Sequence, residues 1–126
     1  MGLFGFGKQK SKENKINWVS LKDPETLNHL IVKDSFEKPV VFFKHSTRCS
    51  ISSMALNRLE SNWNIKDDEA VPVYLDLIQF RAISNAIAER LAVVHQSPQI
   101  IIVKEGKAVY SSSHNQIDAE TIKANL

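Results

Sequence analysis

The sequence predicts an α/β domain in which helices flank both faces of a mixed central sheet. Short apolar stretches alternate with longer stretches that carry apolar residues at helical spacing, an order typical of parallel strands joined by right-handed crossovers. Two more strand-like stretches meet at Glu105-Gly106, which indicates an antiparallel hairpin near the end of the chain. The chain has 126 residues, the size of one domain.

Five strands are expected in this sheet. Residues 16–21, INWVSL, alternate apolar and polar side chains, as a short strand does. Residues 40–44 begin with the apolar run VVFF, which is typical of a strand buried on both faces. The other strands are predicted at residues 71–78, 100–104 and 108–111.

Helices are expected between and after these strands. Asp23-Pro24 predicts an N-cap followed by proline at the first helical position, so the first helix begins there and runs to about Asp34. The last helix is expected from about Asp118, its cap, to Leu126. The apolar stripe predicted for the second helix consists of Ile51, Ala55, Leu59 and Asn62. The stripe predicted for the third consists of Phe80, Ile83, Ile87, Leu91 and Val94.

Composition and charge narrow the classes of function. The net charge of +2 is small, and the one basic cluster, residues 8–15, is interrupted by polar and acidic residues, which is typical of a solvated tail rather than a nucleic-acid arm. No run approaches the roughly 18 apolar residues of a membrane span, and the glycine-broken opening lacks the pattern of a signal peptide. We expect a flexible segment at 1–15, a domain at 16–126, and a cytoplasmic protein.

Cys49, the single cysteine of the chain, is the candidate nucleophile. It follows the buried strand and precedes the second helix. Unpaired N–H groups and a partial positive charge at a helix N-terminus favour the thiolate, which is the nucleophilic form. Lys44, His45 and Arg48 are close in sequence and add positive potential. One cysteine cannot form an internal disulfide, which fits a reducing compartment.

Other interpretations of Cys49 stay open at this point. A lone cysteine is often a small buried apolar residue. Its neighbours favour a reactive thiol instead, because they form a polar, hydroxyl-rich turn: Ser46, Thr47, Arg48, Ser50 and Ser52. No metal site is expected, because the four histidines show no close ligand spacing with Cys49. A protease-like Cys-His pair lacks an accompanying acyl-transfer motif.

The stretch FKHSTRCSISSMAL at residues 43–56, with HQSPQ at residues 95–99, resembles the YtxJ-like monothiol bacilliredoxins, a family of the thioredoxin superfamily. The resemblance covers residues 17–126. It implies a thioredoxin-like fold and a thiol–disulfide oxidoreductase that removes bacillithiol, a small thiol of some bacteria, from mixed disulfides on client proteins. Bacillithiol is then a co-substrate, and no tightly bound cofactor is expected.

The resemblance also implies roles for individual residues. Cys49 matches the attacking cysteine, Ser52 stands where dithiol relatives have a second cysteine, and Pro98 matches the cis-proline of the superfamily. A monothiol reaction has to pass through a mixed disulfide that another thiol clears. We expect three catalytic residues, Cys49, Ser52 and Arg48. We expect five substrate-binding residues, Lys44, His45, Thr47, Ser97 and Pro98.

Several points leave alternatives at these positions. Serine is common at helix starts and proline at strand starts, so Ser52 and Pro98 also have simple structural interpretations. Ser50 departs from the family pattern, in which proline or glycine occurs, and this bears on the reactivity and redox potential of Cys49.

Two other functions fit the same fold. One is an iron–sulfur carrier, although its usual Cys-Gly-Phe-Ser loop differs from the CSIS of this chain, and the other is a non-catalytic interaction module.

Overall fold

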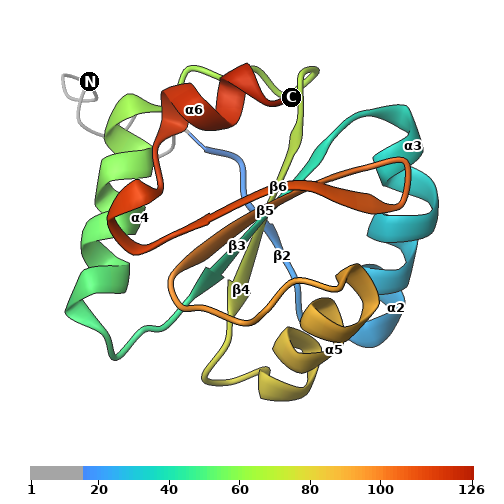
Figure 1. Cartoon of the computed structure of the whole chain (residues 1–126), viewed down its shortest axis with the longest axis horizontal. Coiled ribbons are helices and arrows are strands. Elements are labelled where there is room, and N and C mark those ends of the chain that lie inside the picture. Colours follow the sequence, from blue (N-terminus) through green and yellow to red (C-terminus); the bar gives the residue numbers. More distant parts are fainter. Residues whose placement is uncertain (1–15) are drawn as a thin grey trace, which may run out of the picture.

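The computed structural model describes residues 16–126, and its central sheet is flanked by helices (Figure 1). The elements are, in chain order, β2 (Val19–Ser20), α2 (Pro24–His29), the π-helical turn η1 (Leu30–Asp34), α3 (Ser35–Glu37), β3 (Val40–His45), α4 (Ser50–Asn62), β4 (Val71–Asp76), α5 (Arg81–Leu91), β5 (Gln99–Lys104), β6 (Lys107–Ser113), the short 3-10 helix η2 (His114–Gln116) and α6 (Ala119–Ala124). The predicted α/β class and mixed sheet are confirmed. The segment expected to be flexible, 1–15, lies outside the described residues.

The five strands form one sheet in the order β2-β4-β3-β5-β6. β2, β4 and β3 are parallel, whereas β5 runs antiparallel to β3 and β6 antiparallel to β5. β3 therefore lies at the centre, and all six of its residues are buried, as its apolar run predicted. β2 is shorter than the predicted strand at 16–21, because only Val19 and Ser20 pair with β4.

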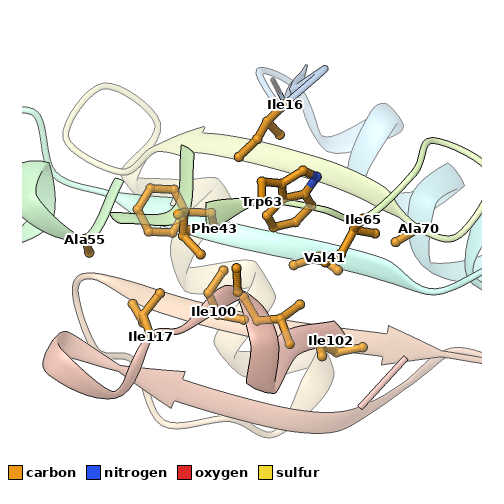
Figure 2. Packing of buried hydrophobic residues seen from close by; sticks show 13 residues of the cluster. Ile16, Val41, Phe43, Ala55, Trp63, Ile65, Ala70, Ile100, Ile102 and Ile117 are labelled. Carbon is orange, nitrogen blue, oxygen red and sulfur yellow. The ribbon is translucent and has the colours of Figure 1, made fainter. Parts of the chain in front are cut away.

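Helices bury apolar side chains on both faces of the sheet. On one face, α4 and α6 cover a core that includes Val41, Phe43, Ala55, Leu59, Ile100, Ile102 and Ile122 (Figure 2). On the other face, α2, η1 and α5 cover a core that includes Leu27, Ile31, Val40, Phe42, Ile83, Ile87 and Ile101. Side chains alternate along a strand, so consecutive residues of β3 enter different cores. We call these the α4 face and the α5 face.

The predicted caps and hairpin turn are confirmed. Asp23 and Asp118 cap α2 and α6, each accepting a hydrogen bond from the backbone N–H three residues further on. The turn between β5 and β6 lies at Glu105 and Gly106, whose φ angles are 52° and 80°. The first helical region extends beyond the predicted end at Asp34, because η1 and α3 continue it to Glu37.

The predicted helical stripes need correction at their ends. Ile51 and Asn62 are exposed, and the buried stripe of α4 is instead Ser52, Ala55 and Leu59. α5 ends at Leu91 because Ala92 adopts a left-handed conformation with φ of 55°, which leaves Val94 outside the helix and 80% exposed. No helix in the described part of the chain has the length and apolar character needed to cross a membrane.

Candidate active site

Cys49 lies where the chain leaves the central strand and enters α4. It is the N-cap residue, with extended backbone (φ −112°, ψ 123°) and no side-chain capping hydrogen bond. Its N–H donates to the Ser46 carbonyl at 3.2 Å, and its carbonyl accepts from the Ser53 N–H at 3.1 Å, the first bond of the helix. Cys49 is a free, half-buried cysteine at the positive end of the helix dipole. This arrangement leaves the Cys49 sulfur partly open to a disulfide that approaches from solvent.

Ser52 replaces a second cysteine with a hydroxyl group that is already hydrogen-bonded. Its side chain is fully buried, and its Oγ accepts from the Ser46 N–H at 3.0 Å. The same oxygen lies 2.7 Å from Nδ1 of His45. A hydroxyl has one hydrogen to donate, and a neutral imidazole with its proton on Nε2 accepts that hydrogen at Nδ1. The Ser52 side chain therefore joins the loop after β3 to the first turn of α4.

His45 contacts this loop on the α4 face of the sheet, through its bond with Ser52. It is 4% exposed, and its ring stacks on Phe43 at a centroid distance of 5.6 Å and contacts Tyr74 at 5.5 Å. Burial lowers the pKa of His45, and the nearby negative charge of Asp76 partly opposes this shift. A neutral His45 is the form that accepts the Ser52 hydroxyl. His45, predicted as substrate-binding, thus lies behind Ser52 rather than on the surface.

Lys44 points to the opposite face of the sheet. It is 0% exposed, its Nζ donates to the Ser84 carbonyl within α5 at 3.2 Å, and Nζ lies 3.3 Å from Nδ1 of His95. Burial lowers the pKa of Lys44 to about 8. The sequence suggested that Lys44 adds positive potential beside Cys49 and contacts substrate. Its position requires a correction, because side chains alternate and Lys44 shares the face of Phe42 rather than that of His45.

The loop at residues 92–98 approaches the same edge of the sheet as Cys49. Lys44 of β3 pairs with Gln99 of β5, so this loop enters β5 where the chain leaves β3. The Ser97–Pro98 bond is cis, as the resemblance implied. Pro98 is buried and Ser97 is half-buried; the Ser97 Oγ atom is itself buried and has no hydrogen-bond partner among residues 16–126. The loop therefore brings Ser97 and Pro98 to the end of the sheet where the chain leaves β3 for Cys49.

The remaining predicted residues lie in the turn before α4, and the structure adds some that were missed. Thr47 and Arg48 are exposed immediately before Cys49. Tyr74 and Asp76 of β4 were not assigned, although Asp76 pairs with His45 in the sheet. The signal was available, because the carboxyl ends of neighbouring parallel strands meet at one edge. Within residues 16–126, no three or more His, Cys, Asp or Glu side chains are grouped to hold a metal ion.

Comparisons with known proteins agree with this geometry. Residues 19–122 match the family model of the monothiol bacilliredoxin BrxC. A solved structure described as a candidate oxidoreductase with a thioredoxin fold is 26% identical, with a TM-score of 0.70 over 85% of this chain and 91% of that chain.

Two thioredoxins illustrate the likeness of fold alone. Thioredoxin f from spinach chloroplast is 17% identical, with a TM-score of 0.62 over 95% of each chain. Thioredoxin from Malassezia sympodialis is 16% identical, with a TM-score of 0.62 over 83% of this chain and 84% of that chain. With the family match, and with a free cysteine at the start of α4, the chain is a thiol–disulfide oxidoreductase that belongs to the monothiol bacilliredoxin family.

Proposed function

We propose that this protein removes bacillithiol from mixed disulfides on client proteins, with Cys49 as the nucleophile. One observation carries the proposal. The half-buried Cys49 caps α4, while the position of a second cysteine holds a buried serine that is bonded to the loop. With a single cysteine in the chain, the adduct on Cys49 has no internal thiol to resolve it. An outside thiol must therefore complete the cycle.

The reaction consists of two disulfide exchanges. The Cys49 thiolate attacks the bacillithiol-side sulfur, the client disulfide breaks, and the client leaves as a thiolate. Cys49 now forms a mixed disulfide with bacillithiol. A second bacillithiol thiolate attacks that disulfide, which restores the Cys49 thiolate and releases oxidised bacillithiol. Each cycle thus consumes one free bacillithiol thiol and joins it to the bacillithiol taken from the client, and a separate reductant returns this disulfide to two thiols.

The two loops at this edge of the sheet supply the contacts. We place the client segment against the backbone of Ser97, a half-buried residue that precedes the cis-proline Pro98 at this edge. The exposed Thr47 and Arg48 offer a hydroxyl and a cation to the small thiol. We place the reaction in the cytoplasm, where reducing conditions keep a lone cysteine free.

A pair of matched substrates tests this function. One model protein with a single cysteine is prepared with either bacillithiol or glutathione on that cysteine. We expect the glutathione adduct to react at least about tenfold more slowly, a ratio that corresponds to about 1.4 kcal/mol. Cys49→Ser should reduce both reactions to background, and Ser53→Ala, which changes an exposed neighbour on α4, should leave them intact. Equal rates on both substrates, or full activity of Cys49→Ser, would contradict the proposal.

A further inference from the structure

A buried cation lies behind the loop at residues 92–98. Lys44 is 0% exposed, and within residues 16–126 it forms no ion pair with a carboxylate. Its Nζ contacts are the Ser84 carbonyl and Nδ1 of His95. A lysine ammonium has only donors, so Nδ1 of His95 is the acceptor and the histidine is neutral with its proton on Nε2. Lys44 therefore joins the central strand to α5 and to this loop.

Gln99 binds the same loop from the neighbouring strand. It pairs directly with Lys44 in the antiparallel register, so the two side chains lie side by side on the α5 face. Gln99 is 3% exposed; its Nε2 donates to the Val94 carbonyl at 3.0 Å, and its Oε1 accepts from the Gln96 N–H at 3.2 Å. Lys44 and Gln99 together hold three consecutive residues just before Ser97.

Polar contacts hold the middle of this loop. Val93 packs against the core of the α5 face and Pro98 is buried, but Ala92, Val94 and Gln96 are exposed. The Ala92 turn ends α5, and β5 begins at Gln99. Between Val93 and Pro98, the bonds from Lys44 and Gln99 restrain how the backbone approaches Ser97.

We propose that Lys44 and Gln99 are positioning residues, which hold the loop at residues 92–98 so that Ser97 meets a client segment at the edge where Cys49 reacts. The client-docking part of this inference rests on the proposed function. Burial of an amine without a counter-charge opposes folding, so an apolar side chain at this position favours stability instead. Lys44 thus contributes to the geometry of the loop at some cost in stability.

Lys44→Met and Gln99→Leu test the proposal, because both retain bulk and remove the donors. Hydrogen exchange of the amides at residues 92–98 should become about tenfold faster, as expected for the loss of a buried hydrogen bond, while exchange in α4 stays unchanged. The KM for a bacillithiolated client should rise several-fold with kcat nearly constant. Alkylation of Cys49 by iodoacetamide, which needs no docking, should stay within about twofold.

Phe42→Leu is the matched control, because it changes the same strand and face without touching the loop. It should lower the unfolding temperature and leave loop exchange and KM unchanged, whereas Lys44→Met should alter exchange and KM without lowering the unfolding temperature. Unchanged loop exchange in both Lys44→Met and Gln99→Leu would overturn the inference, as would effects that match those of Phe42→Leu. Should Lys44→Met fold poorly, Lys44→Leu, which also lacks a donor, replaces it. Hydrogen exchange requires no bacillithiol, so it decides the loop contacts even where the proposed function fails.

Discussion

Two neighbouring residues of β3 support two different loops of the site from opposite faces of the sheet. On the α4 face, His45 bonds Ser52 and supports the turn that carries Cys49. On the α5 face, Lys44 bonds the loop that carries Ser97 and Pro98. Both are buried bases, and burial lowers the pKa of each. The difference teaches that the turn carrying Cys49 and the loop carrying Ser97 are held by separate contacts, so a change behind one loop should leave the other intact.

The largest expected effect comes from the charge on Lys44. Its pKa of about 8 in the folded protein lies below its ordinary 10.5, so between these pH values the unfolded chain binds a proton that the folded protein lacks. Stability therefore rises with pH across this window, by up to about 3 kcal/mol at 1.36 kcal/mol per pKa unit. Urea unfolding at pH 7 and pH 10.5 should show this gain in wild type relative to Lys44→Met. A stability difference that does not vary with pH would argue against a buried charge.

Removal of the Ser52 hydroxyl should have the next largest effect. Ser52→Ala leaves the buried Ser46 N–H without its acceptor, which should lower the free energy of unfolding by about 1–3 kcal/mol. Bacillithiol transfer should become slower but stay measurable. Ser53→Ala, at the exposed next position, should change stability by less than about 0.5 kcal/mol. Equal effects of the two substitutions would show that the Ser52 bonds contribute nothing.

Acid should lower the stability of the folded protein through the protonation of His45. Its pKa is lowered from 6.5, so as the pH falls below 6.5 the unfolded chain takes up a proton before the folded protein does. Stability should therefore fall with acid, and by less than the Lys44 effect because Asp76 opposes the shift. His45→Gln should remove part of this acid loss, with His95→Gln measured beside it because burial also lowers the pKa of His95. If His45→Gln loses as much stability at low pH as wild type does, His45 is not the source of this loss.

The smallest expected effect concerns Arg48 at the surface. Arg48→Glu should slow alkylation of Cys49 by the anion iodoacetate relative to neutral iodoacetamide by about two- to fourfold at low salt, the size of an exposed charge effect. The ratio should return towards wild type at 1 M salt, where the screening length is about 3 Å. Arg90→Glu, exposed at the end of α5, is the control. If the ratio of the two alkylation rates is the same in wild type and Arg48→Glu, and does not vary with salt, Arg48 does not contribute to the electrostatic potential at Cys49.

The fold was predictable because its signals are local. The run VVFF indicated a strand buried on both faces, and β3 is the central strand. Asp23 and Asp118 capped the helices they were predicted to cap, since a capping side chain binds an N–H only three residues away. The position of Cys49 between β3 and α4 follows from the same local patterns.

The polar interior of the site was not predictable in the same way. Lys44 ends the predicted strand and His45 follows it, and both were expected to bind substrate. Their burial instead depends on distant partners: the Ser84 carbonyl and His95 for Lys44, and Tyr74 for His45. Ser52 resembles a surface residue of a helix start, yet it is buried, and its hydroxyl is bonded by the Ser46 N–H and by Nδ1 of His45 at the end of β3. Such pairings emerge only once the sheet register brings the segments together.

The central claim is that Cys49 takes bacillithiol from a client, and a single-turnover reaction tests it most directly. Wild-type protein is mixed with an equimolar bacillithiolated client, quenched with acid at intervals, and analysed by intact mass and peptide mapping. We expect one bacillithiol on Cys49, appearing at the rate at which the client thiol is freed. A client that keeps its bacillithiol, or a client protein joined to Cys49 in place of the small thiol, would contradict the account.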